Sequence, residues 1–121
     1  MARLGHFREL AAWKQARRLT VMAYEVTKAL PPEERHGLVP GMRRAAVSVA
    51  ANIVEGSKRR EIREKVRFYS VAEDSLRELE HFFTASQDLG YLETVDELQG
   101  QAETAGRLLN GLIRSMERRL G

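Results

Sequence analysis

The fold is decided by one segment of the chain, Met42-Arg43-Arg44-Ala45-Ala46-Val47-Ser48-Val49-Ala50-Ala51-Asn52-Ile53-Val54-Glu55-Gly56. Met42, Val49 and Ile53 fall on one face of an α-helix, because they follow one another at spacings close to whole turns. Together with Ala46 they predict one apolar stripe. The other alanines favour the helical conformation and let a neighbouring helix approach closely. The segment therefore predicts a helix packed tightly against another helix.

A row of polar side chains runs beside this stripe, within about 80° of arc at 100° per residue. Buried polar groups need partners, and those partners fix the register of the helix. If a hairpin forms about residues 57–60, Arg44 comes near Ser75 and Glu78 on the returning helix, so we hypothesise an Arg44–Glu78 ion pair. The predicted structural polar row comprises Arg43, Arg44, Ser48, Asn52, Glu55, Ser75 and Glu78. A ligand site and a contact between subunits are the alternatives.

Helical periodicity continues through the rest of the chain, and no segment has the pattern of a strand. Proline at Pro31-Pro32 ends the first helix, Gly90 has the position of a left-handed C-cap, and Thr94 with Glu97 matches a capping box. The predicted helices span about residues 8–30, 40–56, 61–89 and 95–118 of one domain, 1–121. Short connections favour antiparallel neighbours, so we predict an all-α, antiparallel up-and-down four-helix bundle.

Composition restricts the class of protein. The 121 residues, 43% of them hydrophobic, suit one folded domain. No apolar run approaches the roughly 20 residues of a membrane-spanning helix, and the start, MARLGHFREL, lacks the pattern of a secretory signal. The chain contains no cysteine, which excludes disulfides and thiol catalysis. We therefore expect a cytoplasmic protein that does not contact a membrane.

No constellation of residues predicts catalysis. The chain lacks a Gly-x-Ser-x-Gly motif and a phosphate-cradling glycine loop, and its three histidines are scattered. Glu78-Leu79-Glu80-His81 contains one Glu-x-x-His spacing, whereas a carboxylate-bridged di-metal bundle needs two such motifs and further carboxylates. We expect no enzyme activity, no catalytic residue, no metal site and no cofactor.

Charge is distributed unevenly, although the net charge is only +3. Residues 39–67 carry eight basic and three acidic side chains, whereas residues 71–90 carry five acidic side chains and one arginine. The candidate nucleic-acid-binding residues are Lys58, Arg59, Arg60, Arg63, Lys65 and Arg67. Such a group could neutralise backbone phosphates, but no motif that reads bases accompanies it. A head-to-tail contact between copies of the chain and a solvated helical surface are the alternatives.

Apolar side chains outside the main stripes indicate a further interface. They are Val21, Met22, Val47, Val54, Val66, Val71 and Phe82. So many apolar groups beyond the core predict a homo-oligomer.

Several segments resemble a known family in order along residues 7–116. They are Phe7-Arg8-Glu9-Leu10 with Trp13 and Ala16, Leu38, Met42 to Ser48, Asn52 to Gly56, Phe68 to Ala72, Ser75 to Leu79, and Gly90-Tyr91-Leu92. The chain thereby resembles the bacterial four-helix-bundle proteins encoded within 23S rRNA intervening sequences. One departure is Pro40-Gly41, where the family usually has a polar pair that includes glutamine.

The resemblance implies an up-and-down bundle that assembles into a homo-oligomeric ring, typically a pentamer. A related accessory protein of diversity-generating retroelements shares this architecture and binds nucleic acid and a reverse transcriptase through basic surface. The leading hypothesis is thus a non-enzymatic module that forms a ring and binds RNA or DNA non-specifically through basic residues. The alternative is a structural or protein–protein interaction module without affinity for nucleic acid.

Overall fold

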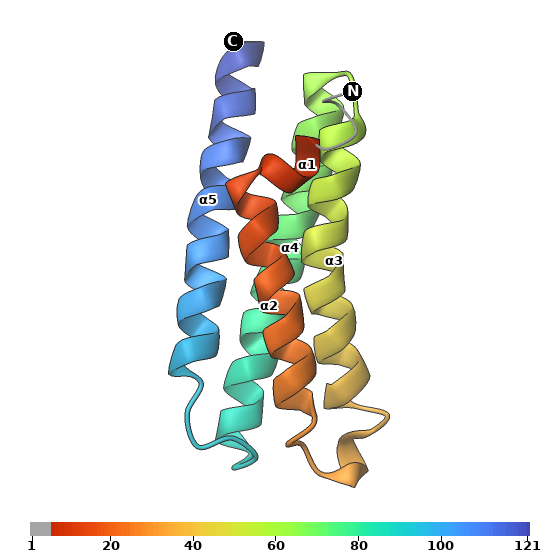
Figure 1. Ribbon diagram of the computed structural model, residues 1–121, viewed down its shortest axis with the longest axis vertical. Helices are drawn as coiled ribbons and strands as arrows, with labels where there is room; N and C mark the ends of the chain where they lie inside the picture. The colour runs from red at the N-terminus through yellow and green to blue at the C-terminus, as the bar shows by residue number, and fades with distance from the viewer. Residues whose placement is uncertain (1–5) are drawn as a thin grey trace.

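The computed structural model describes residues 6–121, and every regular element in that range is helical (Figure 1). The elements are α1 (His6–Glu9), α2 (Ala11–Thr27), the 3₁₀ turn η2 (Pro32–Glu34), α3 (Leu38–Lys58), α4 (Ile62–Asp88) and α5 (Asp96–Leu120). The four long helices alternate in direction, and short connections join them at the two ends of the molecule (Figure 1). The predicted all-α four-helix bundle is confirmed.

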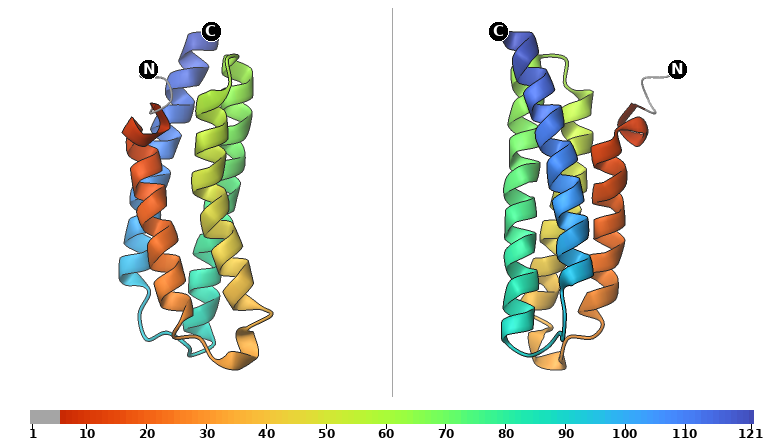
Figure 2. Two further views of the ribbon diagram at one scale, coloured as in Figure 1. Left: turned by 45° about the vertical axis from the view of Figure 1, so that its right-hand side comes forward. Right: turned by 90° about the vertical axis from the view of Figure 1, so that its left-hand side faces the viewer.

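Each long helix packs against two others in the order α2, α3, α4, α5 and back to α2 (Figure 2). The single turn α1 lies across one end of the bundle and contacts α2 and α3. Side-chain contacts also fix the direction of α4 relative to α3. Gly41 near the start of α3 meets Phe82, whereas Gly56 near its end meets Tyr69. The two helices therefore run antiparallel.

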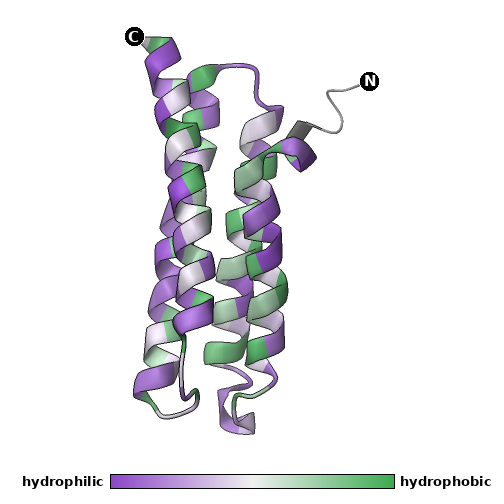
Figure 3. Cartoon of the chain, turned by 60° about the vertical axis from the view of Figure 1, so that its left-hand side comes forward, coloured by the Kyte–Doolittle hydropathy of each residue, from purple (hydrophilic) through white to green (hydrophobic). Residues whose placement is uncertain are grey.

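The core is built from one stripe of each helix, and Figure 3 shows hydrophobic and hydrophilic residues alternating along all four. Small residues bring α2 and α3 together, since Ala16, Ala23 and Ala46 are almost fully buried. Their approach is close enough for the hydroxyl of Thr20 to donate to the carbonyl of Ala46 at 3.2 Å, besides Ala16 O at 3.0 Å within its own helix. Alanine in the deciding segment thus allows the close packing that the sequence predicts.

Helix ends differ from the predicted boundaries by a few residues. The first long helix starts at Ala11 rather than near residue 8, because extended Leu10 separates it from α1. Helix α3 starts at Leu38, so that Pro40 lies inside the first turn, where its missing N–H has no intrahelical partner to lose. The same helix continues beyond Gly56 to Lys58, because glycine is tolerated within a helix whose neighbour needs the space.

The start of α5 is not the predicted capping box. Val95 occupies the N-cap position, and the Thr94 hydroxyl accepts a hydrogen bond from the backbone N–H of Asp96 at 3.2 Å. Thr94 therefore caps the start of α5 from the position just before the N-cap residue. The predicted C-cap is confirmed, because Gly90 has a φ of 83° and follows α4 directly.

Glu34 clamps two connections together at the lower end of Figure 1. One carboxylate oxygen accepts the backbone N–H of Leu38 at 3.1 Å, and the other accepts the hydroxyl of Tyr91 at 2.9 Å. The hydrogen bond to this carboxylate raises the pKa of Tyr91, because it favours the protonated phenol. The α2–α3 and α4–α5 connections are thereby fixed against each other.

Candidate nucleic-acid interface at one end of the bundle

The predicted basic residues come together at the end of the molecule where α3 turns into α4, the upper end in Figure 1. We call this surface the basic end, and it comprises residues 58–67 together with Arg118 and Arg119 of the last turn of α5. These two arginines are not among the candidate binding residues that the sequence indicates. The up-and-down topology brings the last turn of α5 to the end where α3 turns into α4 (Figure 1), and Arg119 there lines a pocket with Ser57 and Lys65.

Two guanidinium groups at the basic end are held by acids and by one ring. Arg59 donates to Glu55 at 2.9 Å, and Arg67 donates to Glu64 at 2.9 Å. Each guanidinium carbon lies 4.7 Å from the centre of the Phe68 ring. Hydrogen bonding from Arg67 lowers the pKa of Glu64. These arginines are therefore partly neutralised and fixed in orientation.

The two lysines of the predicted set also have partners within the chain. Lys58 lies 3.5 Å from a carboxylate oxygen of Glu55, with most of its side chain exposed. Lys65 donates to the carbonyls of Gly56 at 3.3 Å and Ser57 at 3.0 Å, which caps the end of α3. Burial lowers the pKa of Lys65, and the charge of Arg119 lowers it further. Lys65 is thus a structural cap that keeps a positive field at this end.

Arg60 and Arg63 are the exposed members of the predicted set that make no hydrogen bond or ion pair with any residue in 6–121. Arg60 lies in the α3–α4 turn and Arg63 in the first turn of α4. They are the charges most available to an anionic partner. Arg118 and Arg119 are likewise exposed, and the one hydrogen bond of Arg119 within residues 6–121 is to the sulfur of Met116, at 3.7 Å.

Part of the predicted polar row lies in the seam between α3 and α4. The hydroxyls of Ser48 and Ser75 are hydrogen-bonded at 2.7 Å. The amide of Asn52 donates to the hydroxyl of Ser48 at 3.0 Å and to its carbonyl at 2.9 Å. This chain of three side chains joins the two helices at one level and holds their register.

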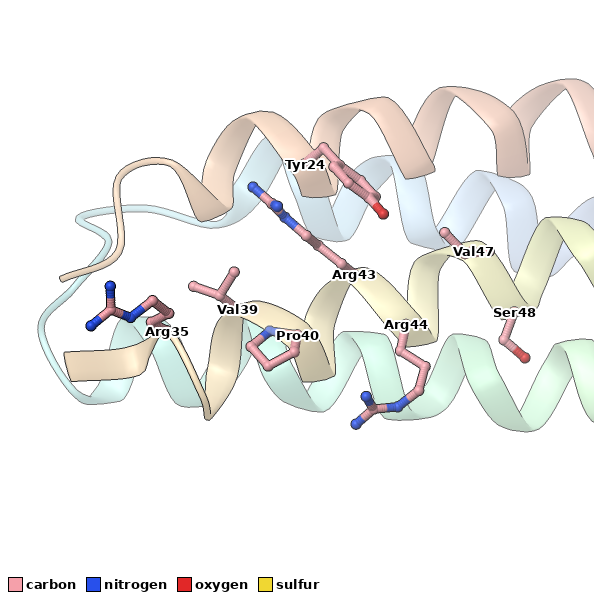
Figure 4. Close-up of a pocket in the computed structure, with 8 residues that line it drawn as sticks. All are labelled: Tyr24, Arg35, Val39, Pro40, Arg43, Arg44, Val47 and Ser48. Atoms are coloured by element: carbon pink, nitrogen blue, oxygen red, sulfur yellow. The ribbon is translucent and has the colours of Figure 1, made fainter. Parts of the chain in front are cut away.

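The predicted Arg44–Glu78 ion pair is wrong, because the structure does not form it. Both side chains are exposed, where an ion pair gains little against the entropy of two long chains. Arg43 reaches the other way, donating from Nε to the Thr27 hydroxyl at 2.8 Å and lying 4.5 Å from the ring centre of Tyr24 on α2. Figure 4 shows the two arginines diverging, as consecutive residues on a helix must.

The remaining predicted member, Glu55, turns away from the seam toward the α3–α4 turn. Its carboxylate binds Arg59 and Lys58 rather than any member of the row. The polar row is thus three side chains, and the other four residues of the predicted set, Arg43, Arg44, Glu55 and Glu78, lie elsewhere.

A hollow of about 690 Å³ lies on the outer side of α3 at the end opposite the basic end (Figure 4). Arg35, Arg43 and Arg44 line it together with apolar Val39 and Val47. Arg35 was absent from the predicted sites, because only the turn between α2 and α3 brings it there. The hollow adjoins an apolar groove between α2 and α3, which shares Val47.

No metal site is evident in the described part of the chain, where no three His, Cys, Asp or Glu residues are grouped. His81 of the Glu-x-x-His spacing is exposed. None of the helices in residues 6–121 is long and apolar enough to cross a bilayer.

Comparison with known proteins gives one finding on relatedness. A family model described as 23S rRNA-intervening sequence protein matches residues 8–111. The matched range runs from α1 into α5 and includes the residue set 58–67, but it ends before Arg118 and Arg119. A search of curated proteins finds no match to the chain.

Proposed function

Since the chain belongs to the family of 23S rRNA-intervening sequence proteins, we propose that it is a non-enzymatic helical-bundle module that binds RNA or DNA without sequence preference through its basic end. The observation that carries the proposal is the exposure of Arg60 and Arg63 without a partner among residues 6–121. Arg118 and Arg119 add two further exposed charges at the same end. We place this activity in the cytoplasm, in keeping with the absence of cysteine.

Phosphate groups are the natural target of such a surface. Arginines on one end of a rigid bundle neutralise phosphates and release counterions, which supplies non-specific affinity. Arg59 and Arg67 each hold a guanidinium group over the Phe68 ring, so this ring is a poor platform for stacking bases. Binding through charge alone, without base reading, is therefore the mode that this end supports.

The first prediction concerns the variant Arg60→Gln/Arg63→Gln. We expect weaker binding of a mixed-sequence single-stranded RNA, and a plot of log K against log salt that is shallower by about 1.4, because about 0.7 is lost per phosphate contact. Fluorescence anisotropy at several salt concentrations measures both quantities. Arg77→Gln/Arg107→Gln removes the same charge from the middle of α4 and α5, and should leave the slope unchanged. Absence of binding by the wild-type protein at low salt contradicts the proposed function.

We also propose that the module acts as a homo-oligomeric ring, for which the family resemblance implies five copies. One side of the molecule, which we call the apolar face, is the groove formed by Trp13, Val21, Val47, Ala50, Ala51 and Val54. Val21 is 57% and Val47 is 43% exposed, which is unusual for two valines so close together. Arg17 and Arg43 flank this face.

The outer side of α4 carries acidic residues, whose charge is opposite to that of the arginines flanking the apolar face. Val71, Asp74 and Glu78 share that side of the helix and are exposed, and neither acid has an ion-pair partner within residues 6–121. A contact between two different surfaces of identical chains is heterologous, and such contacts close into rings when the rotation permits. The acidic α4 of one copy therefore suits the arginine-flanked groove of the next.

The second prediction tests this contact with Val47→Glu. A carboxylate in the centre of an apolar interface is unpaired when buried, so we expect the oligomer to dissociate to monomers at micromolar concentration. Light scattering coupled to gel filtration measures the mass. Leu120→Glu introduces the same charge at a similarly exposed apolar position, 45% against 43%, outside the proposed contact, and should preserve the oligomer. A wild-type protein that is already monomeric contradicts the proposed ring.

One observation favours the alternative function, a structural or protein–protein interaction module. Four of the six predicted binding residues, namely Lys58, Arg59, Lys65 and Arg67, have partners inside the chain. If these contacts are their whole role, the protein forms the same oligomer and binds a protein partner but no nucleic acid. The salt titration above separates the two functions.

A further inference from the structure

A pocket of about 410 Å³ opens at the basic end between α1 and the ends of α3, α4 and α5. Its apolar wall comes from Leu10, Leu112 and Met116. Its polar lining is Glu9, Ser57, Lys65, Tyr69 and Arg119. Lys65 is the one predicted binding residue on its lining, and no member of the polar row lines it, because the pocket forms only where α1 meets the ends of α3, α4 and α5.

Tyr69 is the fixed element of the pocket. The residue is only 2% exposed, and its ring packs directly against Gly56 of α3. Its hydroxyl makes no hydrogen bond with any group in residues 6–121, and no buried side-chain oxygen in that range lacks a partner, so this hydroxyl is open to the pocket that Tyr69 lines. Burial raises the pKa of Tyr69, so the phenol keeps its proton and can donate. Lys65 lies one turn earlier on the same side of α4.

Positive charge in the pocket is incompletely compensated. Lys65 uses two of its three N–H groups on the carbonyls of Gly56 and Ser57, and one remains to donate. Neither Lys65 nor Arg119 forms an ion pair with a described acid. Glu9 is the single carboxylate on the lining, against two cations.

We propose that this pocket is a phosphate site that receives the terminal phosphate monoester of an RNA or DNA strand. The inference rests on the proposed function and specifies which part of the nucleic acid the basic end receives. The expected donors are the Tyr69 hydroxyl, the Lys65 ammonium and the Arg119 guanidinium. A terminal monoester carries close to two charges at neutral pH, which matches two cations.

A phosphodiester inside a strand fits the pocket less well for two reasons. It carries one charge instead of nearly two, and it is flanked by sugars on both sides, whereas a terminal group enters a recess by its free end. Glu9 repels either group and so limits affinity. Replacing Glu9 by glutamine therefore tightens binding of the terminal phosphate.

The experiment compares one labelled single strand with a 5′-phosphate, a 3′-phosphate and hydroxyl ends, by fluorescence anisotropy at constant salt. We expect at least one phosphorylated strand to bind about tenfold tighter than the hydroxyl-ended strand, the effect of one charge-assisted hydrogen bond. Tyr69→Phe and Arg119→Gln each reduce this preference severalfold, and Glu9→Gln increases it. Arg107→Gln, which removes a charge from the outside of α5, leaves the preference intact. Circular dichroism confirms that each variant is folded.

The outcomes of these measurements distinguish an error in the proposed phosphate site from an error in the proposed function. If all three strands bind equally and with the usual salt dependence, the terminal site is wrong and the proposed function stands. If no strand binds, the proposed function is wrong, and titration of inorganic phosphate followed by NMR at residues 57–69 decides the pocket. Shifts confined to these residues and to α5, lost in Tyr69→Phe, support it. Absence of such shifts at low salt overturns it.

Discussion

Replacing Phe83 by alanine is expected to lower the free energy of unfolding by about 3–5 kcal/mol, the largest effect of any single change considered for this protein. Phe83 lies near the end of α4 and is 0% exposed. It belongs to the cluster of buried core side chains, which collapse only partly into the space that the ring leaves. The loss combines the transfer of the ring to water with the cost of the cavity.

Urea unfolding followed by circular dichroism measures this loss. All variants are compared at one protein concentration, because assembly contributes to the stability of an oligomer. Leu89→Ala is the matched control, since Leu89 follows Phe83 on the same chain segment but is 58% exposed. It should cost less than about 0.5 kcal/mol. A loss below about 1 kcal/mol for Phe83→Ala contradicts the assignment of this ring to the core.

Gly56→Ala is expected to destabilise the protein by about 1–3 kcal/mol, whereas Gly100→Ala is expected to stabilise it by about 0.5–1 kcal/mol. Both glycines lie inside long helices, where alanine is intrinsically the better residue. A Cβ on Gly56 falls 2.5 Å from Cε1 of Tyr69, a ring that is 2% exposed and cannot move aside. A Cβ on Gly100 has nothing within 4 Å.

The same unfolding measurement gives both values, and the opposite signs are the decisive result. A double-mutant cycle identifies the cause: if the clash is with Tyr69, Gly56→Ala costs less in a Tyr69→Ala background than in the wild type. Stabilisation by both alanines contradicts the close approach of α3 and α4 at this level. Because Tyr69 also lines the phosphate pocket, Gly56→Ala should weaken the preference for a terminal phosphate as well.

The inner face of α4 shows how well periodicity alone predicts a buried stripe. Phe68, Tyr69, Ala72, Leu76, Leu79 and Phe83 are predicted to face inward, and all except Phe68 are buried. Phe68 is half-buried, with the guanidinium groups of Arg59 and Arg67 over its ring. Predicted Ser86 is also buried, and it satisfies its hydroxyl by donating to the carbonyl of Phe82. A helix with one clear apolar stripe has one orientation that buries this stripe, so its sequence alone determines which face is buried.

In helix α2, hydrophobic periodicity alone does not determine which face is buried. The predicted stripe runs through Leu10, Trp13, Ala16, Thr20, Ala23, Tyr24, Thr27 and Leu30, and it leaves out Leu19. Its members Ala16, Ala23, Thr27 and Leu30 are buried, but Tyr24 is 39% exposed and the omitted Leu19 is only 1% exposed. The buried face is therefore turned toward Leu19 relative to the predicted one. Both orientations bury apolar surface, and the close approach of α2 to α3 through small residues selects the one that the structure shows.

At the candidate nucleic-acid interface, too, the sequence predicts some features and the tertiary structure determines the others. The sequence located the basic residues 58–67, since their charge needs no fold to be recognised. It did not show that Arg59 and Arg67 are held by Glu55 and Glu64, nor that Arg119 faces Lys65. Side-chain partners depend on rotamers and on which helix ends meet, and the spacing of residues along the chain determines neither.

By itself, the sequence determined that this protein is an all-helical bundle related to the 23S rRNA-intervening sequence proteins, because amphipathic periodicity and turn residues are local properties of the chain. The tertiary structure alone decided which of its basic groups remain free and which side chains form the pocket around Tyr69. The physical reason is that pairing and burial are properties of groups brought together from helices far apart in sequence.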